Sequence, residues 1–101
     1  MNSKFVFNKS IRKMDIAEFE RNLSKTPVEN KQKILDYLKN FPESAFTSEP
    51  VRDKYTNKVV YDANNARSDG EYTWYENEIY HFEKYNLKLN DDFIEYVLKR
   101  S

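Results

Sequence analysis

The stretch of chain from residue 69 to residue 95 constrains the fold most strongly. Aromatic rings are interspersed with carboxylates along it, and the carboxylates exceed the cations by six charges. The rings are Tyr72, Trp74, Tyr75, Tyr80, Phe82, Tyr85 and Phe93, and the carboxylates are Asp69, Glu71, Glu76, Glu78, Glu83, Asp91, Asp92 and Glu95. Rings at this density bury large areas, so they must supply much of a small core. A ring that stays at the surface beside an acid is instead typical of a protein-binding face.

A turn and a strand open this stretch. The pair 69–70 includes the only glycine of the chain and predicts a tight turn. The strand predicted over residues 71–75 puts Tyr72 and Trp74 on one face and Tyr75 on the other. Because one layer of core cannot bury both faces, we expect Trp74 in the core and one of the two tyrosines at the surface.

Two short helices follow the strand. Residues 76–85 carry apolar side chains at helical spacing, and Asn86 is typical of a helix C-terminus. Asn90 predicts the start of a last helix, and the acids 91–92 fall in its first turn, where the helix dipole favours negative charge. Helix capping therefore accounts for this acid pair without any catalytic role.

The first part of the chain predicts a helical hairpin. Asp15 has the position of an N-cap for a helix over residues 14–23. Thr26 then resembles the start of a capping box, which predicts a second helix over residues 27–40 that ends before Pro42. Two helices with a short link favour an αα-hairpin.

The middle of the chain predicts a β-hairpin. Segments 51–55 and 59–61 are rich in β-branched and aromatic residues, and Asn57 between them suits a left-handed turn. Residues 42–50 contain prolines and serines, so they predict a connector, and the polar residues 62–68 predict a loop.

These elements add up to an α+β fold. It consists of an N-terminal helical hairpin, a small antiparallel β-sheet and two short C-terminal helices, with a further short strand over residues 4–7. The length of 101 residues suits a single domain over residues 1–101. We expect loose ends at residues 1–3 and 100–101.

Charge and composition exclude several classes of function. The chain has 17 basic and 17 acidic side chains, whereas proteins that bind nucleic acid through phosphates are usually basic, so we expect no nucleic-acid partner. It has no cysteine and therefore no disulfide or thiol chemistry. No apolar run approaches the length of a membrane span or of the core of a signal peptide, so we expect no membrane partner and a cytoplasmic location.

The sequence offers no catalytic constellation. His81 is the only histidine and is expected to lie half-exposed on its helix. Without cysteine, a metal site would need carboxylates, and their spacing is unlike that of metal ligands. One glycine cannot make a glycine-rich phosphate loop. We therefore expect neither an enzyme nor a cofactor or metal site.

The second half of the chain resembles a known family of small bacterial proteins. The runs PVRDKYTNKVV and SDGEYTWYENEIYHFEKYNLKLNDDFIEYVL are similar to a pattern in immunity proteins of contact-dependent growth inhibition and related polymorphic-toxin systems. The likeness covers about residues 50–98. Its anchors are Pro50, Asp53, Asp69, Gly70, Trp74, Tyr85, Leu89, Phe93 and Val97. The resemblance implies a cytosolic protein that binds one cognate toxin, commonly a nuclease, and blocks it.

The acidic, aromatic stretch is what such a blocker needs. A nuclease cleft is positive because its substrate is a polyanion, and charge complementarity raises the rate and specificity of association. The residues predicted to form this partner-binding face are Asp69, Glu71, Tyr72, Tyr75, Glu76, Glu78, Tyr80 and Glu83.

Two other hypotheses remain open from the sequence. A small nucleic-acid-binding regulator or antitoxin could use the basic N-terminal segment, which carries Lys4, Lys9, Arg12 and Lys13 and no acid. A solvated, frayed terminus would explain the same charges. An interaction or assembly module could instead use a sheet edge or an aromatic patch.

Overall fold

A computed structural model describes residues 4–7 and 9–100 as an α+β fold. Four strands form one sheet in the order β1-β6-β5-β2, and β3 and β4 form a separate two-stranded hairpin. The strands are β1 (Lys4–Phe5), β2 (Glu43–Ala45), β3 (Val51–Arg52), β4 (Val59–Tyr61), β5 (Ala66–Ser68) and β6 (Tyr72–Tyr75). Strand β1 runs parallel to β6, while β6, β5 and β2 are antiparallel neighbours.

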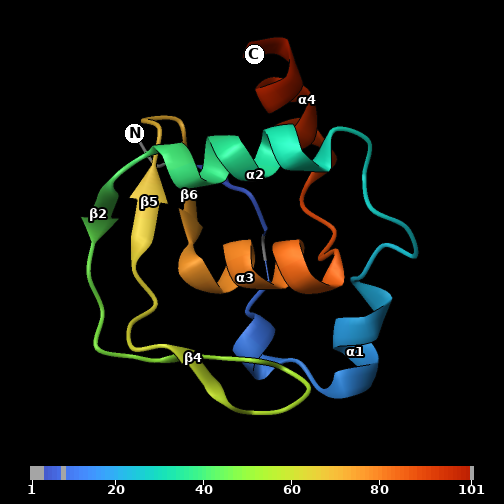
Figure 1. Cartoon of the computed structure of the whole chain (residues 1–101), viewed down its shortest axis with the longest axis vertical. Coiled ribbons are helices and arrows are strands. Elements are labelled where there is room, and N and C mark those ends of the chain that lie inside the picture. Colours follow the sequence, from blue (N-terminus) through green and yellow to red (C-terminus); the bar gives the residue numbers. More distant parts are fainter. Residues whose placement is uncertain (1–3, 8, 101) are drawn as a thin grey trace.

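Helices cover the four-stranded sheet. They are the 3₁₀ helix η1 (Ile11–Lys13) and the α-helices α1 (Ile16–Arg21), α2 (Lys31–Asn40), α3 (Glu76–Tyr85) and α4 (Asp91–Arg100). In Figure 1, α2 and α3 lie side by side, run in opposite directions, and have β5 to their left. The side chains of Lys39 and Glu83 join these two helices with an Nζ–Oε2 distance of 2.9 Å.

Several local predictions are confirmed. The Asp15 carboxylate accepts a hydrogen bond from the Glu18 N–H at 2.8 Å, as an N-cap should. Asn57 has a φ of 60° in the turn between β3 and β4, and Asn86 has a φ of 62° at the end of α3. Both asparagines occupy the left-handed region that their short polar side chains tolerate. The two C-terminal helices also form as expected.

The predicted N-terminal helical hairpin is not formed as expected. Helix α2 begins at Lys31 rather than after Thr26, because Asn30 takes a left-handed φ of 63° immediately before it. The Thr26 carbonyl instead accepts a hydrogen bond from the Ser24 hydroxyl in a local turn. Helix α2 packs against α3 and α4, and Figure 1 shows α1 on another side of the molecule.

The sheet is also larger than predicted, and it is mixed. Strand β2 lies in the segment predicted to be a connector, and β5 lies in the segment predicted to be a loop. Both are three residues long and carry polar side chains, so neither has the apolar alternation that identifies a strand in sequence. Strand β5 forms because it pairs with β6, with Arg67 opposite Trp74.

The core unites the N-terminal segment with the helices and the sheet. Its buried side chains are Val6, Phe7, Ile11, Met14, Phe19, Ile34, Leu35, Leu38, Tyr72, Trp74, Ile79, Phe82, Leu87, Leu89, Phe93 and Val97. Trp74 is fully buried, as predicted, and its indole N–H donates to the Leu38 carbonyl at 3.0 Å. Of the predicted loose ends, residues 1–3 and 101 lie outside the described residues, and Arg100 closes α4. No helix in the described part of the chain is long and apolar enough to cross a membrane.

Candidate functional site

The eight residues of the predicted partner-binding face differ widely in exposure. Glu71 and Glu83 are exposed. Four are half-buried: Asp69, Tyr75, Glu76 and Tyr80. Tyr72 and Glu78 are buried, so they cannot belong to an open surface.

The Asp53 carboxylate binds the hydroxyls of two tyrosines of the aromatic stretch. One of its carboxylate oxygens, Oδ1, accepts the backbone N–H groups of Tyr55 and Thr56 in the β3–β4 turn. The other, Oδ2, accepts the hydroxyls of Tyr80 and Tyr85, each at 2.6 Å. Burial opposes ionisation of Asp53, but these hydrogen bonds outweigh it and hold the pKa of the carboxyl well below its ordinary value. The carboxylate therefore fastens the β3–β4 hairpin to α3.

Asp69 repeats the same arrangement in the β5–β6 turn. Its Oδ1 accepts the backbone N–H groups of Glu71 and Tyr72, and its Oδ2 accepts the hydroxyls of Tyr37 at 2.5 Å and of Tyr96 at 2.8 Å. Burial again opposes ionisation, and the hydrogen bonds led by that of Tyr37 lower the pKa of Asp69. We call these two arrangements the Asp53 clamp and the Asp69 clamp.

The clamps place several side chains differently from the predicted acidic, aromatic face. Asp69 and the Tyr80 hydroxyl were both expected to point outward, but each is bound to a side chain outside the predicted set: Asp69 to Tyr37 and Tyr96, and Tyr80 to Asp53. The two acids that remain exposed are also paired, Glu71 with Lys4 at 3.6 Å and Glu83 with Lys39 at 2.9 Å. The eight residues therefore do not form one continuous surface.

Glu78 is buried for a local reason. Its carboxylate accepts the backbone N–H of Tyr75 at 2.8 Å and so closes the capping box at the start of α3. Burial raises the pKa of Glu78 to about 8, although the hydrogen bond from Tyr75 acts in the opposite direction. The carboxyl is therefore largely protonated at neutral pH.

His81 is not half-exposed, as the sequence suggested, but fully buried. Its ring packs against Phe19, Tyr80 and Tyr85. The Nε2 atom accepts the Lys54 backbone N–H at 3.1 Å, and Nδ1 donates to the Asn77 carbonyl at 2.8 Å. Burial lowers the pKa of His81, which favours the neutral ring that this pattern requires. Both nitrogens are thus engaged: Nε2 joins α3 to the β3–β4 hairpin, and Nδ1 bonds within α3.

The described residues contain no group of three or more histidine, cysteine or acidic side chains placed to hold a metal ion.

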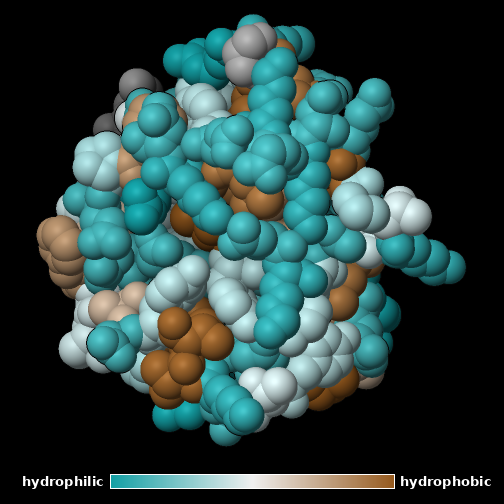
Figure 2. Space-filling model, viewed as in Figure 1, coloured by the Kyte–Doolittle hydropathy of each residue, from teal (hydrophilic) through white to brown (hydrophobic). Residues whose placement is uncertain are grey.

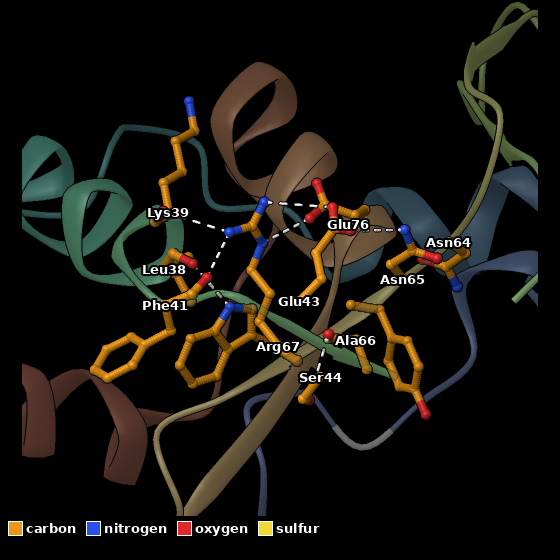
Figure 3. A network of polar contacts seen from close by, with 12 residues as sticks. Leu38, Lys39, Phe41, Glu43, Ser44, Asn64, Asn65, Ala66, Arg67 and Glu76 are labelled. Carbon is orange, nitrogen blue, oxygen red and sulfur yellow. Dashed lines mark hydrogen bonds and ion pairs between the residues drawn. The ribbon is translucent and has the colours of Figure 1, made fainter. Parts of the chain in front are cut away.

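Arg67 organises a polar network on β5 that the sequence did not reveal. Its guanidinium donates to Glu76 at 2.7 Å and lies 3.7 Å from Glu43, while Nη1 donates to the Phe41 carbonyl at 2.5 Å (Figure 3). Arg67 thereby ties together β2, the end of α2 and the start of α3. Its side chain is only one-fifth exposed, so both carboxylates are held in place by a shielded cation.

A groove opens beside this network. It has a volume of about 500 Å³ and lies between β2, β5 and the chain after β4. Its lining residues include Tyr61, Asp62, Glu43, Glu76 and Arg67.

Exposed apolar side chains lie on β4 and next to β2, two strands that contribute to the groove, and of these side chains Tyr61 lines it. Phe46 is 74 % exposed and follows β2, where the next residue, Thr47, donates its N–H to the Asn65 side chain in the groove wall. Val59 and Tyr61 are exposed on β4, and Figure 2 shows an apolar patch over that strand. We call Phe46, Val59, Tyr61, Glu43 and Asp62 together the β2–β4 face. Nothing in the sequence marked Phe46, because a lone aromatic in a predicted connector gives no periodic signal.

The N-terminal segment forms a second hollow with the β3–β4 hairpin. A cavity of about 690 Å³ is lined by Arg12 and Lys13 of η1 and by Arg52 and Lys54 of the hairpin. Within the described residues 4–7 and 9–14, the segment packs into the fold, because Val6, Ile11 and Met14 are buried in the core.

No known protein family, curated protein or solved structure matches the chain.

Proposed function

We propose that this chain is a cytoplasmic immunity protein that binds and neutralises a cognate bacterial toxin and has no catalytic activity of its own. The resemblance over residues 50–98 supports the class. The exposed β2–β4 face supports the binding role, and its central observation is the phenyl ring of Phe46, which is 74 % exposed. Exposed aromatic residues are enriched at protein interfaces, where a few of them supply most of the binding free energy.

The surroundings of Phe46 fit a basic partner. Glu43, Asp62 and Glu76 line the adjacent groove, and Arg67 holds two of them at fixed positions. Carboxylates fixed before binding lose little conformational freedom when a partner docks. The groove lining carries three carboxylates against two cations, Lys39 and Arg67, so it has a small negative excess. A toxin with a positive surface, such as a nuclease with its substrate cleft, therefore suits this face, with Phe46 and Tyr61 as apolar anchors.

The experiment uses the C-terminal toxin domain of the reading frame next to this chain. Isothermal titration calorimetry measures its affinity, and growth of cells that express both proteins measures neutralisation. Phe46→Ser should weaken binding roughly thirty-fold or more, as for an interface hot spot. Ile16→Ser, at a 42 % exposed residue on α1, is the matched control and should leave binding unchanged.

Two outcomes separate the parts of the proposal. Failure of the native chain to bind the toxin or to rescue growth would remove the immunity function. Tight binding that Phe46→Ser does not change would keep the function but would place the interface elsewhere on the surface.

A further inference from the structure

Two neighbouring cavities, together called the hollow, lie against the N-terminal segment. The larger has a volume of about 690 Å³ and the smaller about 360 Å³. They share Ser10, Ile11, Asn64 and Asn77 as lining residues. Both volumes fall in the range of pockets that hold small ligands in other proteins.

The larger cavity is rich in cations. Arg12 and Lys13 reach it from η1, and Arg52 and Lys54 reach it from the β3–β4 hairpin. Two carboxylates also line it: Glu49 pairs with Arg12, and Asp53 accepts two tyrosine hydroxyls. The lining therefore carries four cations and two carboxylates. Because the whole chain is neutral, this excess of positive charge is a local arrangement. It attracts an anion of two or more charges, such as a phosphate group.

The smaller cavity has a different character. Phe5, Phe7, Ile11 and Tyr75 give it apolar and aromatic walls. Lys9 and Glu78 are the charged or ionisable side chains of its lining apart from the tyrosine. A flat, partly apolar group with hydrogen-bonding edges fits such walls better than an ion does.

Polar groups at the floor of the hollow are set for hydrogen bonding. The Asn77 side-chain carbonyl is buried and has no hydrogen-bond partner among the described residues. A buried acceptor without a partner is costly, so a donor is expected there. The oxygen exposes almost no surface to the cavity, so a ligand reaches it only after the Asn77 side chain turns. The neighbouring Glu78 is 93 % buried by its relative exposure of 7 %, and as a neutral carboxyl it both donates and accepts.

We propose that this hollow binds a nucleotide unit, with its phosphate between Lys13 and Arg52 and its base in the smaller cavity near Asn77 and Glu78. The base supplies the N–H donors and the flat ring, and the phosphate supplies the charge. The nucleotide is either free or an accessible residue of a single-stranded nucleic acid, since both present the same chemistry. This activity is independent of toxin binding through the β2–β4 face.

Calorimetry on the full chain tests the proposal. The probes are the four ribonucleoside 5′-monophosphates, inorganic phosphate, ribose 5-phosphate and a single-stranded oligonucleotide of about ten residues. We expect at least one nucleotide or the oligonucleotide to bind at least about tenfold more tightly than inorganic phosphate and ribose 5-phosphate, and to lose affinity as salt rises. Binding of mononucleotides assigns a free ligand, and binding of the oligonucleotide alone assigns a strand.

Three variants locate the site. The double variant Lys13→Glu with Arg52→Glu should weaken binding at least about tenfold, while Lys33→Glu with Lys99→Glu makes the same charge change on exposed residues of α2 and α4 and should leave it unchanged. Ser10→Trp fills the junction of the two cavities from an exposed position and should abolish binding. Thermal unfolding of each variant shows whether it is folded.

Several results would overturn the proposal. These are a lack of binding by every nucleotide and by the oligonucleotide, equal affinity for inorganic phosphate, or full binding by a folded Ser10→Trp variant. None of them bears on growth rescue by the toxin experiment, so the two proposals fail separately.

Discussion

The two carboxylate oxygens have the same roles in Asp53 as in Asp69. Oδ1 fixes a turn through backbone N–H groups, and Oδ2 receives two tyrosine hydroxyls from distant elements. Each carboxylate thus accepts four hydrogen bonds, which is the full capacity of its lone pairs. Hydrogen bonds to a charged acceptor are stronger than those between neutral groups. Loss of the carboxylate should therefore cost more stability than loss of any one of its four donors.

Asp69→Asn tests the value of that charge. The amide cannot accept all four donors, so we expect the free energy of unfolding to fall by about 2–4 kcal/mol at pH 7. Folding lowers the pKa of Asp69, so the stability due to its charge is present above its unfolded pKa of about 4 and is lost as pH falls further. Urea unfolding at pH 7 and pH 3 should show that the difference between the two proteins shrinks in acid. Asp62→Asn, at an exposed residue, is the control and should change stability at neither pH.

Glu78→Gln should raise the free energy of unfolding at neutral pH, whereas Asp69→Asn should lower it. Folding raises the pKa of this carboxyl from 4.5 to about 8, so the native protein holds the proton more tightly than the unfolded chain. Its stability is therefore greatest below pH 4.5 and declines as pH rises to 8. The titratable groups that line the same cavity are Lys9 and Tyr75.

The glutamine keeps the acceptor for the Tyr75 N–H but never ionises. We expect the variant to match the native protein near pH 4.5 and to be more stable by roughly 2 kcal/mol at pH 7. Thermal unfolding of both proteins across this range measures the difference. A constant difference at all pH values would show that the native carboxyl does not titrate there.

At the scale of elements, local signals predicted where helices end and turns occur. Asp15, Asn57 and Asn86 act as their residue types suggest, because a cap or a left-handed turn depends on one side chain and its own backbone. The predicted start of α2 was wrong. Thr26 and Asn30 both suit the position before a helix, and packing on α3 and α4 favours the later start. Strands β2 and β5 were missed because pairing makes them strands and composition does not: β5 pairs with β6, and β2 pairs with β5.

The β5–β6 turn offers a test of one backbone requirement. Gly70 has a φ of 100°, and a Cβ built there would meet no atom within 4 Å. Gly70→Ala therefore introduces backbone strain without a clash and should lower the free energy of unfolding by about 1–2 kcal/mol. A D-alanine at the same position, introduced by chemical synthesis, should avoid this loss. Equal losses for both would assign the effect to something other than the backbone.

At the scale of the whole molecule, the candidate site shows the limit of sequence patterns. The dense stretch of rings and acids was correctly recognised, and so was the role of the rings in the core. Whether a given acid faces solvent or a tyrosine hydroxyl depends on elements far away in sequence, as Tyr37 and Tyr96 do for Asp69. The exposed ring of Phe46 and the basic hollow also arise only when distant segments meet.

Deletion of residues 1–7 tests whether the N-terminal segment belongs to the fold. It removes β1 together with the buried side chains of Val6 and Phe7. Loss of two buried apolar side chains should cost about 3–6 kcal/mol, enough to leave a domain of this size marginal or unfolded. Circular dichroism with urea titration measures the loss, and a shift of less than 1 kcal/mol would contradict the placement of these residues in the core.

The parallel pairing of Lys4 with Tyr72 has a consequence for biosynthesis. The first strand to leave the ribosome has no neighbour until β6 has been made, so its hydrogen bonds must wait for most of translation. Such distant pairing slows closure of the native structure and exposes the nascent chain in the meantime. Each new copy of the protein can therefore complete its four-stranded sheet only near the end of its own synthesis.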